Sequence, residues 1–169
     1  MIMINSVKYS PMDGPRVEAA LRMINPYLSG LDSYYPCFNQ WFHTRVLPGM
    51  YDGTRSIIQA TDKGSIVAFA ILKHDIKEQK ICTFYVDKRC RRSGIGSILM
   101  GSCLDFFSKK PIITVTESLI ESYSSLLSKF QFGRPLVWES AYKKNVTEYI
   151  FDPAKTILPT ENNGFYYLE

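Results

Sequence analysis

The chain has 169 residues, of which 46% are hydrophobic, 14% aromatic and 21% charged. This composition is typical of one globular domain with a sizeable core, and it argues against a disordered or low-complexity chain. Lys and Arg number 20 against 16 Asp and Glu, a net charge of +4 that permits an anionic ligand but makes nucleic acid an unfavoured partner.

The first half of the chain predicts a strand followed by two helices. A short β-prone stretch covers residues 4–9, and apolar residues at helical spacing then predict a helix from residue 14 that ends between Pro26 and Gly30. A second helix is expected from Asp32 to Pro48 and carries a cluster of aromatic side chains. In that helix we expect Phe38 and Phe42 to pack in the core, whereas Trp41 and Tyr34 lie off this apolar stripe.

Three successive strands are expected next, over residues 56–60, 65–73 and 80–86. The first two are separated by Asp62-Lys63-Gly64, which has the composition of a tight hairpin turn. An apolar helical face then follows Gly94 and leads to a buried strand over 111–116. Because a helix links them, this strand is expected to run parallel to strand 80–86.

The rest of the chain predicts a further amphipathic helix over 119–130 and two strands, over 136–138 and 146–151. The order predicts a mixed α/β fold in which one sheet carries helices on both faces. We expect a single domain over residues 1–152 and an irregular tail over 153–169, whose last two residues match an expression-vector scar.

Motifs for other environments are absent from the sequence. No window approaches roughly 18 consecutive apolar residues, and the start of the chain lacks a secretory signal, so a cytoplasmic protein without a membrane contact is expected. The cysteines are widely spaced and form no CxxC pair, which favours free thiols and no metal; they are Cys37, Cys82, Cys90 and Cys103.

The chemistry is concentrated in residues 80–97, KICTFYVDKRCRRSGIGS. Here a strand runs into a basic loop with two glycines that opens a helix. Gly94 and Gly96 allow a ligand to approach the backbone closely, and the first helical turn presents unpaired N–H groups. Four basic residues stand beside them: Lys88, Arg89, Arg91 and Arg92. The pattern favours a pyrophosphate, whereas the plainer interpretation is a solvated loop before a helix.

Neither GxxxxGK[ST] nor GxGxxG occurs, which disfavours a P-loop and a Rossmann turn. The motif from Arg91 to Gly96 instead resembles the [Q/R]xxGx[G/A] signature of the GCN5-related N-acetyltransferases (GNAT). The element order over roughly residues 4–151 is similar to this family's as well, and the resemblance implies the GNAT fold with a mostly antiparallel central sheet.

The resemblance implies acetyl-CoA as cosubstrate and no metal. Its pyrophosphate would bind the loop residues Arg91, Arg92, Ser93, Gly94, Ile95, Gly96 and Ser97. The pantetheine arm and thioester would lie along Phe84, Tyr85 and Val86, where backbone N–H groups are the expected oxyanion donors. The implied reaction is transfer of the acetyl group to a primary amine by direct attack in a ternary complex.

The catalytic side chains depart from the family pattern. Alignment places Ile120 and Leu127 where many members carry Asn and the acidic Tyr. Tyr123 lies one helical turn before Leu127 and is our candidate general acid; the alternative is that it only packs on the helix face. Glu117 is the candidate base; the alternative is that it is a charge at the helix N-terminus, where the helix dipole favours a carboxylate.

Three functions therefore remain open. The first is an N-acetyltransferase acting on a small-molecule or protein amine. The second is a CoA-binding module without transferase activity, which the missing Tyr and Asn motivate. The third is a toxin-like acetyltransferase acting on aminoacyl-tRNA. The acceptor is not encoded in any motif, although Trp41 and Tyr34 are expected to face it, and a homodimer is left open.

Overall fold

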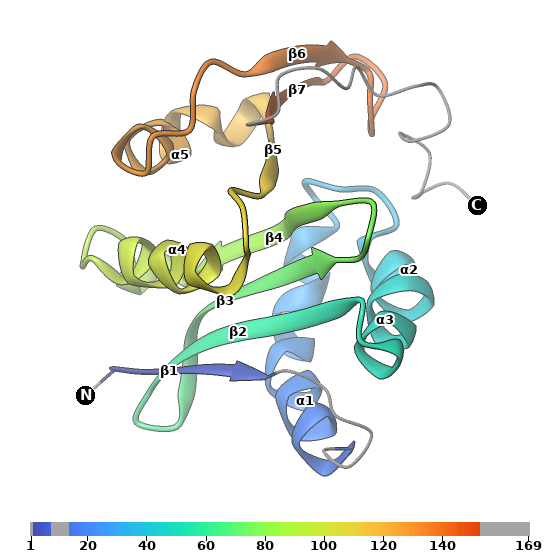
Figure 1. The fold of residues 1–169 in the computed structure, drawn as a ribbon, viewed down its shortest axis with the longest axis vertical. Helices are drawn as coiled ribbons and strands as arrows, with labels where there is room; N and C mark the ends of the chain where they lie inside the picture. Colours follow the sequence, from blue (N-terminus) through green and yellow to red (C-terminus); the bar gives the residue numbers. More distant parts are fainter. Residues whose placement is uncertain (1, 8–13, 153–169) are drawn as a thin grey trace.

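The computed structural model describes residues 2–7 and 14–152. Within these residues the strands form one sheet in the order β1-β2-β3-β4-β5-β7-β6 (Figure 1). The strands are β1 (Ile2–Val7), β2 (Arg55–Asp62), β3 (Ser65–His74), β4 (Gln79–Val86), β5 (Ile112–Thr116), β6 (Leu136–Glu139) and β7 (Thr147–Phe151). Neighbouring strands are antiparallel except β4 and β5, which are parallel as expected from the connecting helix.

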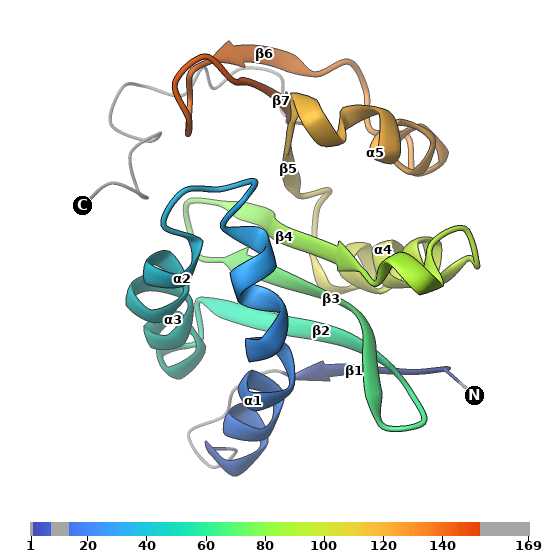
Figure 2. The same ribbon diagram turned by 180° about the vertical axis from the view of Figure 1, so that it is seen from behind.

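Helices cover both faces of this sheet (Figures 1 and 2). They are α1 (Gly14–Leu31), α2 (Phe38–Trp41), η1 (Phe42–Val46), α3 (Leu47–Asp52), η2 (Lys88–Cys90), α4 (Ile95–Phe106) and α5 (Glu117–Lys129). The first four pack with Ile57, Phe69 and Ile71 in one core cluster. Helices α4 and α5 pack with Ile58 and Ile113 in a second cluster on the other face. The mixed α/β fold predicted from the sequence is confirmed.

The N-terminal elements differ from the prediction in their bounds. Strand β1 begins at Ile2, earlier than expected, and residues 8 and 9 of the predicted strand lie outside the described residues. Helix α1 continues through Pro26, which does not end it, and stops at Leu31, one residue after Gly30. Pro26 is exposed, and the carbonyl group that loses its hydrogen bond to the missing N–H can turn to water.

The predicted second helix begins later than expected and contains a π-helical turn between two α-helical segments. Cys37 adopts a left-handed conformation (φ 59°) before α2, a π-helical turn follows at η1, and α3 runs on to Asp52. Pro48 therefore does not end the helix. It stands near the start of α3, directly after the π-helical turn of η1, and the helical backbone continues through it to Asp52.

The predicted hairpin between β2 and β3 is confirmed. Lys63 (φ 48°) and Gly64 (φ 80°) both have positive φ, the backbone geometry that matches the twist of a two-residue hairpin turn.

Strands β4 and β5 part after a short pairing. Ile81 pairs with both Leu72 of β3 and Ile113 of β5, whereas Thr83 pairs with Ile71, so Cys82 is an extra residue that forms a β-bulge in β4. Among the described residues, β4 and β5 pair at two positions, Lys80 with Ile112 and Ile81 with Ile113, and β5 then turns away from β4 (Figures 1 and 2). We call this opening, bounded by residues 84–86 and 114–116, the splay. It leaves backbone groups of β4 without a neighbouring strand.

Candidate active site

The basic loop after β4 forms an anion-binding helix terminus. Gly94 is the N-cap of α4 with φ +89°, a conformation that L side chains rarely adopt. The N–H groups of Ile95, Gly96 and Ser97 belong to the first turn, so they have no intrahelical acceptor and point out with the positive end of the helix dipole. This is the arrangement that binds phosphate in many folds.

Gly96, in the first turn of α4, also suits a phosphate-binding site. A Cβ atom built at this residue would meet Val86 Cγ2 at 3.7 Å, which is ordinary contact, so packing within the protein does not require glycine here. A larger side chain would extend from the helix terminus across the first-turn N–H groups. A phosphate group therefore suits the residues that are present.

The charges at this terminus differ from the sequence prediction. Arg89 donates to both carboxylate oxygens of Asp87, at 3.1 Å and 2.9 Å, and so is already engaged in an ion pair. These hydrogen bonds hold the pKa of Asp87 at about 2, below its ordinary value. Arg91 Nε donates to the Val86 carbonyl oxygen at 3.2 Å, while the side chain of Arg92 is exposed.

A further cation comes from another helix. Lys129, in the last turn of α5, places its Nζ 3.0 Å from Ser97 Oγ in the first turn of α4. Sequence reasoning missed it because the two residues are far apart in the chain and meet through the packing of α5 beside α4. The cradle therefore combines a local glycine motif with a distant lysine.

The expected pantetheine strand bounds the splay. Phe84 and Val86 pack toward α4 and α5, whereas Tyr85 points to the opposite face. There its ring stacks on Phe69 at 5.2 Å and contacts Tyr27 at 5.3 Å. The side chains of these three residues therefore do not share one surface. What they share is a stretch of backbone at the edge of the splay.

The structure brings Tyr123 to the splay. Its hydroxyl donates to the Phe84 carbonyl oxygen at 2.5 Å, and the two rings meet edge to face at 6.0 Å. Burial raises the pKa of Tyr123 to about 12, so the hydroxyl keeps its proton at neutral pH. Leu127, one turn on, is buried in the core, and Ile120 packs at its margin.

Glu117 is placed differently from a base in a pocket. It is the first residue of α5, it is exposed, and its Oε2 accepts a hydrogen bond from the Thr147 N–H at 3.2 Å. This contact connects the start of α5 to the start of β7. The side chain is thus engaged with the backbone of β7.

A second carboxyl, not singled out from the sequence, lies nearby. Glu148 on β7 pairs with Thr116 of β5, is 1% exposed, and has an Oε2 atom without a hydrogen-bond partner among the described residues. Burial raises the pKa of Glu148 to about 7. One signal in the sequence could have found it. Glu148 stands two residues before the apolar Ile150, and residues two apart in a strand point to the same face, so a buried Ile150 predicts a buried Glu148.

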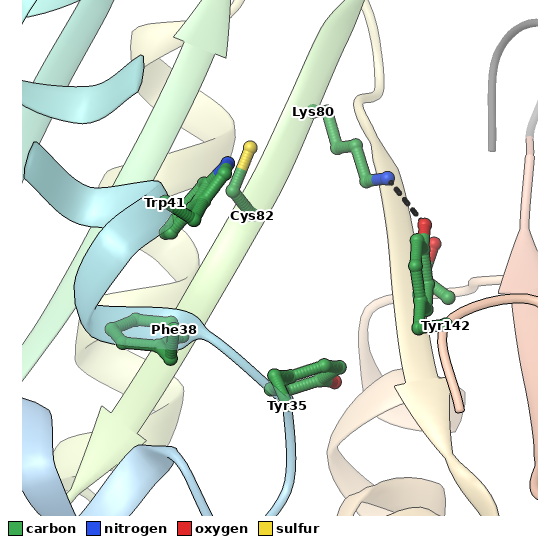
Figure 3. A pocket seen from close by; sticks show the side chains of 7 residues that line it. Tyr35, Phe38, Trp41, Lys80, Cys82 and Tyr142 are labelled. Carbon is green, nitrogen blue, oxygen red and sulfur yellow. Dashed lines mark hydrogen bonds between the residues drawn. The ribbon is translucent and has the colours of Figure 1, made fainter. Parts of the chain in front are cut away.

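A small pocket opens on the sheet face that carries α2 (Figure 3). It is lined by Tyr35, Phe38, Trp41, Lys80, Cys82, Thr114 and Tyr142. Lys80 Nζ donates to the Tyr142 hydroxyl at 3.2 Å, and the rings of Tyr142 and Tyr35 meet edge to face at 6.2 Å. Trp41 and Phe38 line the pocket and are also buried in the core, whereas Tyr34 does not line the pocket.

Other features concern the described part of the chain only. All four cysteines are free, and Cys82 Sγ accepts a hydrogen bond from Arg55 Nη1 at 3.0 Å. Within residues 2–7 and 14–152, no group of three or more His, Cys, Asp or Glu side chains is arranged to hold a metal ion. None of the helices in these ranges has the length and apolar character needed to cross a membrane.

Comparison with solved structures finds the same fold. The ribosomal-protein-S18-alanine N-acetyltransferase of Escherichia coli is 17% identical with a TM-score of 0.60, covering 89% of this chain and 91% of that one. A GNAT-family acetyltransferase of Bacillus cereus is 18% identical with a TM-score of 0.59, covering 88% and 95%. A streptothricin acetyltransferase of Bacillus anthracis, solved with acetyl coenzyme A, is 16% identical with a TM-score of 0.51, covering 57% and 60%.

Comparison at the level of sequence gives the family. No curated protein sequence matches the chain. The model of the acetyltransferase (GNAT) family, however, matches residues 19–122, which include β2 to β5 and the basic loop. Together with the splay between β4 and β5 and the cradle at α4, this match shows that the chain belongs to the GNAT family and is an acyltransferase.

Proposed function

We propose that the protein transfers the acetyl group of acetyl-CoA to a primary amine by direct attack in a ternary complex. The observation that carries this proposal is the junction of the splay with the N-terminus of α4. A long ligand with phosphates at one end fits this junction. The first-turn N–H groups of α4, with Arg92 and Lys129, would hold the pyrophosphate, and the free edge of β4 would pair with the amide-bearing pantetheine arm.

The two substrates would reach the splay from opposite faces. The cradle and Tyr123 lie on the side of α4 and α5, while the pocket around Lys80 lies on the side of α2. The amine would enter through that pocket and meet the thioester carbonyl between the strands. Backbone N–H groups near Tyr85 and Val86 are the proposed donors to the developing oxyanion.

Tyr123 is the proposed general acid toward the leaving thiolate. Its hydroxyl is at the splay, and with a pKa of about 12 it stays protonated and can donate. Bound to the Phe84 carbonyl oxygen, it is held in one orientation. Donation to sulfur would exchange this hydrogen bond for one to the thiolate.

Binding of acetyl-CoA is tested by thermal unfolding with Gly94→Val and its control. Acetyl-CoA should raise the melting temperature of the wild-type protein, by mass action on the folded state. Gly94→Val forces a β-branched residue into a positive-φ position and should remove this increase. Gly101→Ala is the matched control on the same helix, since a Cβ there meets no atom within 4 Å, and it should keep the increase. An equal increase in all three proteins would contradict the cradle.

Transfer is then assayed by release of free thiol from acetyl-CoA with a panel of polyamines, amino acids, aminoglycosides and lysine peptides. Thiol release that depends on one class of amine supports the transferase and names its acceptor. Leu127, buried where many family members carry the acidic tyrosine, favours one other candidate, a CoA-binding module without transfer activity. That alternative predicts the melting-temperature increase without thiol release from any amine.

A further inference from the structure

A buried carboxyl stands on the acceptor side of the splay. Glu148 of β7 lies directly opposite Thr116 of β5, and residues opposite each other in an antiparallel pair point to the same face. Thr114, two residues before Thr116, also shares that face, and it lines the pocket with Lys80. Glu148 therefore lies on the face through which the amine would enter, away from Tyr123 and the cradle.

The strand registers also set the height of Glu148 along the splay. Ile81 of β4 pairs with Ile113 of β5, and Cys82 is the extra residue of the bulge. Counted past the bulge, Tyr85 runs level with Thr116, and Glu148 lies beside Thr116. Glu148 is thus one strand away from the splay, at the height where the backbone of Tyr85 and Val86 would hold the thioester carbonyl.

The bonding of Glu148 is unusual for a structural carboxyl. Buried polar atoms in proteins are nearly always hydrogen-bonded, yet its Oε2 has no partner among the described residues. By contrast, Oε2 of the exposed Glu117 accepts from the Thr147 N–H. Glu148 therefore keeps an acceptor atom free on the side of the sheet where the amine would arrive.

The surroundings of Glu148 tune its proton affinity. Burial raises its pKa, the nearby carboxylate of Glu117 raises it further, and a hydrogen bond from Thr116 and the charge of Lys80 lower it, with a result of about 7. Trp138 of β6 is its neutral cross-strand neighbour. A base effective at neutral pH needs a pKa in this range.

We propose that Glu148 is the general base that takes the proton of the acceptor amine, directly or through one water molecule. This inference rests on the proposed acetyl transfer. The ammonium gives one proton to the carboxylate, and the neutral nitrogen attacks the thioester carbon. The C–N bond forms as the C–S bond breaks, and Tyr123 gives its proton to the thiolate sulfur. The second proton lost by the nitrogen restores the Tyr123 hydroxyl through solvent, and Glu148 returns its proton to solvent. An amide and free CoA result.

The pH dependence of kcat/KM for the amine, measured with full-length protein, tests this assignment. In the wild-type protein kcat/KM should fall below about pH 7, as Glu148 becomes protonated. Glu148→Gln should lower kcat/KM at pH 7 by about 100-fold or more and remove this limb. Glu139→Gln, at an exposed carboxyl at the end of β6, is the matched control and should keep both the limb and a rate within a few-fold of wild type.

Thr116→Val provides a second variant that keeps the carboxyl. Removing the hydrogen bond that favours the charged form should move the limb to higher pH. A wild-type rate and limb in Glu148→Gln, or a limb that Thr116→Val leaves unmoved, would overturn the assignment while leaving acetyl transfer in place. No thiol release by the wild-type protein with any amine, despite binding of acetyl-CoA, would overturn the proposed function and this inference with it.

Discussion

Replacing Glu148 by Gln should change how the stability of the protein depends on pH. The folded state holds the pKa of Glu148 at about 7, above the ordinary value of 4.5, so the folded protein binds this proton more tightly than the unfolded chain. Its favourable contribution is therefore complete below about pH 4.5 and is lost as the pH rises through 7. Glutamine stays neutral and lacks this dependence.

The size of the effect follows from the same pKa. Without relaxation around the charge, the shift corresponds to about 3 kcal/mol of unfolding free energy between pH 4.5 and pH 8. The pKa of about 7 already includes the effects of Lys80 and Thr116, but water entry and relaxation around the charge reduce the cost, so we expect about 1–2 kcal/mol. Glu148→Gln should then match wild type near pH 5 and be more stable than wild type at pH 8.

Urea unfolding of both proteins at pH 5, 6.5 and 8 measures this difference. The difference in unfolding free energy between variant and wild type isolates Glu148, because all other titrating groups are common to both proteins. A difference that stays constant within about 0.5 kcal/mol across this range would refute a raised pKa. The measurement does not require acetyl-CoA or an amine, so it is independent of the proposed reaction.

Three more predictions address the fold and the splay. Leu99→Ala, at a fully buried site in α4, should lower the unfolding free energy by about 2–5 kcal/mol, whereas Ile98→Ala, 49% exposed beside it, should change it far less; urea unfolding compares them. Tyr123→Phe should lower kcat with little change in the KM for acetyl-CoA, and an unchanged turnover at every pH would rule out the acid role. Asp87→Asn should lower the melting temperature at pH 7 but have less effect at pH 2, because the wild-type carboxyl, whose pKa is about 2, is by then losing its charge; equal decreases at both pH values would contradict the ion pair with Arg89.

Much of the fold was predictable from local patterns. The hairpin at Lys63 and Gly64 needs two residues with positive φ, and the sequence places turn residues there. The helix after Gly94 follows from apolar periodicity. The prediction of the second helix was wrong in its bounds and its regularity. The aromatic stripe indicates which side chains are buried, but the left-handed Cys37 before α2 and the π-helical turn at η1 depend on packing against the sheet.

In the candidate site, too, the local features were predictable from the sequence and the contacts between distant residues were not. The cradle was predictable from RRSGIGS, since a glycine N-cap and a helix terminus are local features. The ion pair between Arg89 and Asp87 was not predictable, because the geometry decides whether the Arg89 guanidinium binds Asp87 or a phosphate. Tyr123 was predicted from helical spacing, but its contact with Phe84 requires α5 to lie across the splay.

By itself, the sequence determined most of the helices and strands, the glycine-rich cradle and the resemblance to the GNAT family, because each depends on residues close together in the chain. The tertiary structure alone decided that β7 lies between β5 and β6, that β4 and β5 part after two pairs, and that Lys129 reaches α4. Strand insertion joins residues far apart in the chain, and burial then sets the chemistry. Glu148 is an ordinary carboxyl in the sequence, and its burial in the sheet, opposite Thr116, raises its pKa to about 7.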